Sequence, residues 1–329
     1  KSHLPLALKE TTMRLLLTAA LAFALSCGLA APAMALDKVR FVTDWKAQAE
    51  HGGFYQAKAR GYYEEEGLDV DIIQGGASVN VPLLLGSEQA EFGIGSNSFI
   101  PLNMVAEEVP VVAVAAIFQK DPQVLITHPR DDVKSIADMK GKPIMISDAA
   151  AGAYWIWLKA TFGFDDSQIR KYTYNPAPFL TDPTAIQQGY VTSEPFQIQR
   201  EGGFEPQLFL LADENYPSYA NLILATEKIA TSRPLLVAKF VRASIRGWVD
   251  YLSGDPTPGN ALIKADNPKM TDEILANAIA KMNEYKLIGD KPGEMTDARW
   301  QEFFDVMSKN GVYKTDLDWK RAFTTVFLQ

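Results

Sequence analysis

The side chains best suited to chemistry lie in five short segments, each directly after a stretch typical of a β-strand. The segments are residues 44–55, 75–78, 96–98, 147–155 and 192–196. In open parallel sheets, ligands bind beyond the carboxyl ends of the strands, where the backbone N–H groups of following helices point outward. The positions of these segments therefore predict a ligand site.

Three of these residues have side chains suited to a flat, nitrogen-containing ligand. Trp45 stands at the polar end of a strand, where its indole could stack on a ring or could simply fill a surface of the lobe. Tyr154 and Trp155 open a helix, and we expect Tyr154 to face the ligand. Glu194 precedes Pro195 in a strand-to-helix turn, where its carboxylate could accept N–H groups of a ligand or could stabilise the helix N-terminus.

The other candidates are small or polar. His51 could donate to a ligand, or it could cap or pack a helix-entry loop. Gly75 and Gly76 form a tight turn with accessible N–H groups, although neither Walker nor dinucleotide spacing occurs. The candidate ligand-binding residues are Trp45, His51, Gly75, Ser78, Ser96, Asn97, Asp148, Tyr154 and Glu194.

Composition excludes several kinds of function. The only cysteine is Cys27 and the only histidines are His3, His51 and His128, so disulfide frameworks and Cys/His zinc sites lack their residues. The 32 lysines and arginines are outnumbered by 40 aspartates and glutamates, and no basic cluster is present, which argues against nucleic-acid binding. We expect no cofactor, no metal and no catalytic residue.

The N-terminal segment predicts export. Met13 and Arg14 precede an apolar stretch over residues 15–31, and Ala33-Met34-Ala35 follows as a cleavage site, which together resemble a secretory signal peptide. A membrane anchor is the alternative, but about 17 Ala-rich residues are marginal for spanning a bilayer. Lipid attachment at Cys27 is a further alternative, because the preceding residues partly resemble a lipobox. Residues 1–12 are interpreted as an upstream extension, and the mature protein is predicted to be periplasmic.

The elements that must position these side chains alternate between strands and helices. Strands are predicted at 39–43, 70–73, 92–94, 111–118, 124–127, 144–147, 172–174, 190–192 and 207–211, and helices at 53–60, 81–87, 153–162 and 183–188, with mainly helical sequence from 233 onward. This pattern predicts an α/β protein whose mostly parallel sheets are flanked by helices. A chain of 329 residues is long enough for two such lobes.

The predicted division of the chain follows from two extended crossovers, at residues 117–123 and 211–220. Residues 1–35 form the upstream extension and signal peptide, 36–118 the first part of lobe 1, 119–213 lobe 2, and 214–329 the completion of lobe 1 with the C-terminal helices. Residues 95–98 are predicted to form a polar turn after the third strand.

The sequence resembles a known group of proteins over nearly the whole mature chain. Asp44-Trp45 and the blocks at 51–58 and 60–70 resemble the opening of the substrate-binding proteins for thiamine-pyrimidine precursors. Shorter matches follow at 91–96, 109–111, 138–142, 189–191 and 194–195. The broader family also serves sulfonates, nitrate, taurine and riboflavin.

The resemblance implies a two-lobed periplasmic binding protein of type II, which serves an ABC importer and docks on a membrane permease. A monomer is expected. Within this resemblance, Trp45 becomes a stacking wall, Glu194 a hydrogen-bond acceptor, and Ser96, Asn97 and Tyr154 ligand contacts.

The same family includes enzymes that build the thiamine pyrimidine, but this chain lacks their reactive groups. It has no histidine between His51 and His128 and no cysteine after Cys27. Residues 46–50 also replace the usual proline- and asparagine-containing stretch, which leaves the ligand's identity open. We therefore expect a non-enzymatic solute-binding component that captures a small planar, pyrimidine-like molecule.

Two rival functions stay open at this point. An anion-binding protein for sulfonate, nitrate or taurine would want an arginine at the site, and none of the five segments contains one. An exported hydrolase would need a nucleophile with a base, for which His51 and His128 are the histidine candidates.

Overall fold

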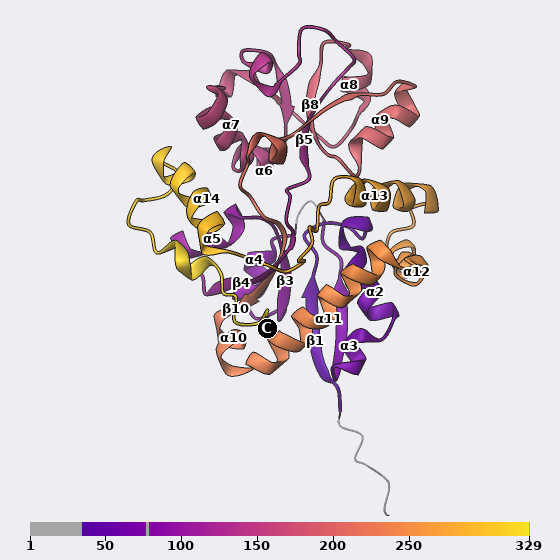
Figure 1. Ribbon diagram of the computed structural model, residues 1–329, viewed down its shortest axis with the longest axis vertical. Helices are drawn as coiled ribbons and strands as arrows, with labels where there is room; N and C mark the ends of the chain where they lie inside the picture. The colour runs from indigo at the N-terminus through magenta and orange to yellow at the C-terminus, as the bar shows by residue number, and fades with distance from the viewer. Residues whose placement is uncertain (1–34, 77–78, 329) are drawn as a thin grey trace, which may run out of the picture. The chain divides into compact units, whose positions relative to one another are not determined.

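The computed structural model describes residues 35–76 and 79–328, and its strands form two five-stranded sheets. The first sheet has the order β2 (Leu68–Ile73), β1 (Asp37–Val42), β3 (Phe92–Asn97), β10 (Ala220–Thr226) and β4 (Val111–Phe118). The second has the order β7 (Ile169–Lys171), β6 (Ile144–Ile146), β8 (Ile186–Tyr190), β5 (Gln123–Thr127) and β9 (Gln207–Leu210). We call the first sheet with its helices lobe A and the second with its helices lobe B; Figure 1 shows lobe B, with α6 to α9, above lobe A.

The two sheets share one topology. In lobe A, β10 runs antiparallel to both β3 and β4, and in lobe B, β5 runs antiparallel to both β8 and β9. Four of the five strands in each sheet therefore point the same way. β5 follows β4 and β10 follows β9, so each reversed strand enters its sheet straight from an edge strand of the other sheet. The chain crosses between the sheets at residues 119–122 and 211–219.

Helices flank both sheets. Lobe A contains α2 (Gly52–Ala59), α3 (Tyr62–Glu65), α4 (Val81–Gly86), α5 (Phe99–Ala106), α10 (Glu227–Ser232), α11 (Pro234–Ser253), α12 (Thr257–Asp266), α13 (Asp272–Glu284) and α14 (Asp297–Lys309). Lobe B contains α6 (Asp148–Ala151), α7 (Tyr154–Phe162), α8 (Ala177–Thr181) and α9 (Glu194–Gly202). Short 3₁₀ turns are η1 (Ala49–His51), η2 (Ile136–Met139), η3 (Asp166–Gln168), η4 (Leu211–Glu214) and η5 (Trp319–Ala322).

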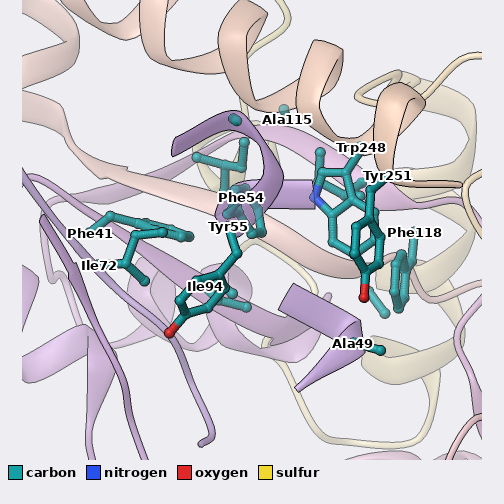
Figure 2. Packing of buried hydrophobic residues seen from close by; sticks show 14 of the residues in the cluster. Phe41, Ala49, Phe54, Tyr55, Ile72, Ile94, Ala115, Phe118, Trp248 and Tyr251 are labelled. Carbon is teal, nitrogen blue, oxygen red and sulfur yellow. The ribbon is translucent and has the colours of Figure 1, made fainter. Parts of the chain in front are cut away.

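The core of lobe A is organised around α11, which buries an apolar stripe against α2 and the sheet. The Phe240 ring stacks on Phe92 with a centroid separation of 4.1 Å, and Trp248 meets Phe54 edge-on at 5.7 Å. Figure 2 shows the Trp248 and Tyr251 rings beside Phe54 and Phe118. Truncating a buried aromatic of this kind to alanine costs about 3–5 kcal/mol.

Two glycines allow α2 and α11 to cross closely. A Cβ at Gly247 would lie 2.2 Å from the Gly53 carbonyl oxygen, and a Cβ at Gly53 would lie 2.2 Å from Trp248 Cγ. Backbone and ring atoms occupy the space that any side chain would need. The Gly52-Gly53 pair next to His51 therefore serves helix packing, and it places the start of α2 against the core.

The α/β fold class is confirmed, and several predicted elements are corrected. The predicted helix over 183–188 is wrong, because residues 186–190 form the central strand β8 while the helix lies earlier, at α8. The predicted strands at 172–174 and 190–192 lie at 169–171 and 186–190. The prediction also missed β10, the helices α5 and α9, and the continuation of β3 through Asn97, where a turn was predicted.

The misread strand has a physical explanation. Gln187 and Gln188 are buried in β8, where amide side chains occupy positions that sequence patterns usually give to apolar residues. Within residues 35–76 and 79–328, no helix combines the length and apolar character needed to cross a membrane. The predicted signal peptide, its alternatives and Cys27 lie outside the described residues.

Candidate ligand site at the lobe interface

A carboxylate at the end of the first strand anchors one polar group, which we call the Asp44 network. Asp44 accepts a hydrogen bond from Ser96 Oγ at 2.5 Å and lies 3.1 Å from His51 Nε2. Burial alone would raise the pKa of Asp44, but the contacts with His51 and Ser96 outweigh burial and lower it. The structure thus brings together two sequence-predicted residues, His51 and Ser96, around an aspartate that the candidate list did not include.

Trp45 contacts an aromatic residue of the other lobe. Its ring centroid lies 5.2 Å from that of Tyr174, which follows β7 in lobe B. Tyr174 is 50% exposed and lies 5.2 Å from the ring of Tyr172. Trp45 and Tyr174 therefore form a tilted aromatic contact across the lobe interface.

Glu194 closes the turn between β8 and α9. Its Oε2 accepts the Tyr190 N–H at 2.7 Å, and its Oε1 accepts the Tyr172 hydroxyl at 3.3 Å. A side chain at Gly189 would collide with Ile126 and with the stem of Glu194, because a Cβ there would lie 2.6 Å from Ile126 Cδ1 and 2.9 Å from Glu194 Cβ. Burial raises the pKa of Glu194, although the hydrogen bond from the Tyr190 backbone acts in the opposite direction.

A buried glutamate links the lobes directly. The side chain of Glu50, in η1 of lobe A, accepts a hydrogen bond from the hydroxyl of Thr192 in lobe B. The Glu50 carbonyl oxygen accepts the Asn221 side-chain amide at 2.7 Å. These bonds join the start of α2, the end of β8 and the reversed strand β10. The lobes are therefore in contact in this structure.

A second polar group lies where the chain crosses between the lobes. We call Asp121, Tyr154, Tyr190 and Tyr216 the crossover cluster. Asp121 is only 2% exposed, and its Oδ1 accepts the Gln123 N–H at 3.0 Å. Burial raises the pKa of Asp121 to about 7. Burial, and then the negative charge of Asp121, raise the pKa of each of the three tyrosines.

The Tyr154 hydroxyl stands out within the crossover cluster. The residue is 2% exposed, yet its hydroxyl has no hydrogen-bond partner among the described residues. Next along the helix, the Trp155 indole donates to Asp166 at 3.0 Å and its ring is fully buried. Tyr154 thus keeps a buried hydroxyl without a partner among the described residues, whereas Trp155 packs into lobe B.

The site contains four carboxyl groups and few basic side chains that could compensate them. Among the described residues, none of four carboxylates forms an ion pair with a lysine or arginine; these are Asp44, Glu50, Asp121 and Glu194. Such a surface suits a ligand that brings N–H donors or positive charge, and it disfavours an anion.

The remaining predicted residues play other parts in this structure. The Gly75 N–H donates to the Trp45 carbonyl at 3.1 Å and to Thr43 Oγ1 at 3.0 Å, and a Cβ on Gly75 would lie 2.1 Å from the Thr43 carbonyl oxygen. Asn97 Oδ1 accepts the Phe99 N–H at the start of α5. Asp148 is exposed and lies 3.5 Å from Lys171 Nζ. Ser78 lies outside the described residues.

Sequence patterns offered only partial signals for the residues that the candidate list lacks. Asp44 stands beside Trp45 at a strand end, so the same argument that predicted Trp45 could have predicted Asp44. Asp121, Tyr190 and Asn221 lie at strand ends and crossovers whose meeting depends on the reversed strands β5 and β10. Their proximity could not be read from spacing along the chain.

The arrangement of two similar α/β lobes joined by two crossovers is that of the periplasmic binding proteins. The periplasmic aliphatic sulphonate binding protein SsuA from Escherichia coli superposes with a TM-score of 0.65 at 14% identity, covering 88% of this chain and 92% of that one. A profile of the NMT1/THI5-like family matches residues 48–257, and the chain belongs to that family.

Relatives within the family carry several names. A protein of Haemophilus influenzae named putative thiamine biosynthesis protein is 22% identical, with 88% of this chain and 92% of the relative covered. The formylaminopyrimidine-binding protein of Halalkalibacterium halodurans is 26% identical, over 65% and 66% of the two chains. A 4-amino-5-hydroxymethyl-2-methylpyrimidine phosphate synthase of Saccharomyces cerevisiae is 24% identical, over 88% and 82%. The relatives of this chain thus include a binding protein and a synthase.

Proposed function

We propose that this protein is the solute-binding component of an ABC importer, which captures a small planar, nitrogen-containing molecule between lobes A and B. The observation that carries the proposal is the Trp45–Tyr174 ring pair beside carboxylates that have no lysine or arginine partner. The ring pair would provide stacking faces, and the carboxylates would accept the N–H groups of an aminopyrimidine-like ring. The relative named as a formylaminopyrimidine-binding protein supports this ligand class.

Each lobe contributes a distinct part of this site. In lobe A, Trp45 supplies an aromatic face and the Asp44 network supplies an ionised acceptor. In lobe B, Glu194 and Tyr154 supply a carboxylate and a hydroxyl. Ligand that contacts both lobes favours the closed arrangement, so affinity and closure draw on the same free energy. The hydrogen bond between Glu50 and Thr192 would add to that closed state.

The cellular role follows from the same family and fold. Export by a cleaved signal peptide would place the protein in the periplasm, and its closed form would dock as a monomer on a membrane permease. Lobe A would comprise residues 36–118 and 214–329, and lobe B residues 119–213. Periplasmic binding proteins are the structural neighbours that support this placement.

We propose binding rather than catalysis. A synthase is among the relatives, so the distinction needs its own test. His51 is the histidine at the site, and it is buried and held by Asp44. Turnover of a pyridoxal phosphate or pyrimidine substrate by the wild type, abolished in His51→Ala, would overturn the binding assignment.

The first experiment is a thermal-shift screen of residues 36–329 against aminopyrimidines, flavins, purines, sulfonates and nitrate. Ligand at about a hundredfold excess over its dissociation constant adds about 2.7 kcal/mol to stability, enough for a shift of several degrees. A response confined to pyrimidine-like rings would support the proposal. A response only to sulfonate or nitrate would reject it in favour of an anion-binding protein.

A further inference from the structure

The crossover cluster combines features that structural aspartates rarely share. Asp121 is 98% removed from solvent, and its hydrogen bonds come from the Gln123 backbone, two residues further along, and from the side chain of Ser218 in the second crossover. A carboxylate can accept about four hydrogen bonds, so much of its capacity is unused. An asparagine could serve that turn equally well, because its carbonyl oxygen accepts the same N–H. The turn therefore does not explain why the side chain carries a charge.

The arginine near Asp121 makes its hydrogen bonds with other groups. Arg299 of α14 is the cationic residue whose charge acts on Asp121. Its guanidinium donates to the Pro217 carbonyl at 2.9 Å and the Ser218 carbonyl at 2.7 Å, and it lies 4.1 Å from the centroid of the Tyr219 ring. Arg299 thus holds the second crossover in place and forms no ion pair with Asp121 in the described residues.

Three buried polar atoms, just after the two crossovers and at the start of α7, lack a hydrogen-bond partner among the described residues. The buried Tyr154 hydroxyl and Gln123 Oε1 have no hydrogen-bond partner in the described part of the chain, and neither does Asn221 Oδ1 at the start of β10. Leaving such groups buried and unsatisfied costs about 1–3 kcal/mol each. The two amide atoms can only accept hydrogen bonds, and the hydroxyl can accept as well as donate. The missing partner is therefore rich in donors.

The crossover cluster is continuous with the proposed ligand site. The Val191 N–H donates to the Pro122 carbonyl at 3.0 Å, and Gln123 pairs with Tyr190 between β5 and β8, so the segment that carries Asp121 lies against the turn that carries Glu194. On α7, Trp157 lies three residues beyond Tyr154, and its ring centroid is 5.0 Å from that of Tyr216 in the second crossover. Burial and the charges of Asp121 and Glu194 raise the pKa of Tyr154, in agreement with this placement. A ligand held at Trp45 and Glu194 would therefore extend toward Asp121.

We propose that Asp121, with the Tyr154 hydroxyl beside it, is a subsite for a positively charged nitrogen, so that the preferred ligands are rings carrying an ammonium or amidinium group. This inference rests on the proposed function and names the ligand's charge. An ammonium group would supply three donors and the charge that Asp121 lacks. The bound ammonium group would then form an ion pair with Asp121, which has no lysine or arginine partner among the described residues.

Isothermal titration calorimetry at pH 8 with two matched probes tests this directly. The probes are 4-amino-5-hydroxymethyl-2-methylpyrimidine and its 5-aminomethyl counterpart, which differ in size by almost nothing and in charge by one. We expect the wild-type chain to bind the aminomethyl probe at least tenfold more tightly. Asp121→Asn should remove this preference while changing affinity for the hydroxymethyl probe by less than about threefold.

Control variants separate the subsite from general effects. Asp213→Asn removes an exposed carboxylate near the second crossover, where Asp213 pairs with Lys120, and should keep the wild-type preference. Tyr154→Phe removes only the hydroxyl and should weaken the aminomethyl probe several-fold more than the hydroxymethyl probe. Tyr154→Phe also keeps the test decisive if Asp121→Asn fails to fold.

The outcomes distinguish the inference from the proposed function. Equal binding of both probes, or a preference that survives in Asp121→Asn, would overturn the subsite while leaving the pyrimidine-binding proposal standing. Binding of neither probe would overturn both. A tenfold preference lost in Asp121→Asn and kept in Asp213→Asn supports both.

Discussion

Two aspartates at the lobe interface have opposite environments. Asp44 receives hydrogen bonds from His51 and Ser96 within its own lobe, and its pKa is lowered. Asp121 receives the Gln123 N–H and a hydrogen bond from the Ser218 side chain, but burial outweighs both and raises its pKa to about 7. The protein thus stabilises the ionised carboxylate of Asp44 but disfavours the ionised carboxylate of Asp121. We infer from this contrast that Asp44 holds His51 and Ser96 in position, whereas Asp121 is available to bind a positively charged group of the ligand.

The largest expected effect tests the cost of the Asp121 charge. The folded state holds a proton on Asp121 at pH values where the unfolded chain has lost it, because burial raises the pKa of this carboxyl from its ordinary value of 3.8 to about 7. Stability therefore falls as pH rises from about 4 to 7. Asp121→Asn should remove this penalty and gain up to about 4 kcal/mol over wild type at pH 8. Urea unfolding at pH 4.5 and pH 8 measures it, and parallel pH profiles for the two proteins would contradict it.

Asp44→Asn should act in the opposite direction. The lowered pKa of Asp44 means that its ionised form stabilises the fold above the unfolded pKa, and that this stability is lost as pH falls through the folded value. At pH 7 the variant should lose about 2 kcal/mol, the usual worth of hydrogen bonds to a charged group. Chemical denaturation at pH 7 would show the loss. A variant as stable as wild type would mean that the Asp44 network does not hold the site together.

Trp45→Ala should reduce affinity without a comparable loss of stability. Trp45 is only partly buried, and its aromatic contact is with Tyr174 across the lobe interface. Removing one stacking face should weaken a pyrimidine probe about tenfold, whereas Trp45→Phe should recover most of the affinity. Calorimetric affinities within twofold for all three proteins would remove Trp45 from the site.

Thr192→Val should give the smallest effect and report on closure. The substitution keeps the shape of the side chain and removes the hydroxyl that bonds Glu50 across the lobes. Since one such bond contributes about 1 kcal/mol, the closed state and the affinity should weaken about fivefold. Small-angle scattering without ligand should show a more open average for the variant. Unchanged affinity and scattering would mean that this bond does not bias closure.

Sequence reasoning reached the fold class because its signals are local. The β-branched runs at β1, β2 and β4 and the apolar stripe of α11 carry their own periodicity, so their alternation identified an α/β protein. It failed at β8, where buried glutamines replace apolar residues. It also missed β10, whose role depends on its entering lobe A from lobe B.

The candidate site also combines residues that local sequence can predict with contacts that depend on the tertiary fold. Trp45 and Glu194 stand at strand ends that spacing alone can locate, so they were within reach of the sequence. The Asp44–Ser96 bond joins residues 52 positions apart, and the Glu50–Thr192 bond joins residues 142 apart. Such pairings depend on the order of strands in the two sheets, which local patterns do not encode.

The sequence by itself determined the chemical character of this protein: an acidic chain with three histidines, one cysteine and aromatic residues at strand ends. Only the tertiary structure decided which carboxylates are satisfied and which are not. The physical reason is that the pKa and bonding of a side chain follow from its burial and its neighbours in space. The two crossovers bring Asp121, Tyr154 and Tyr216 together from segments that are remote in the chain.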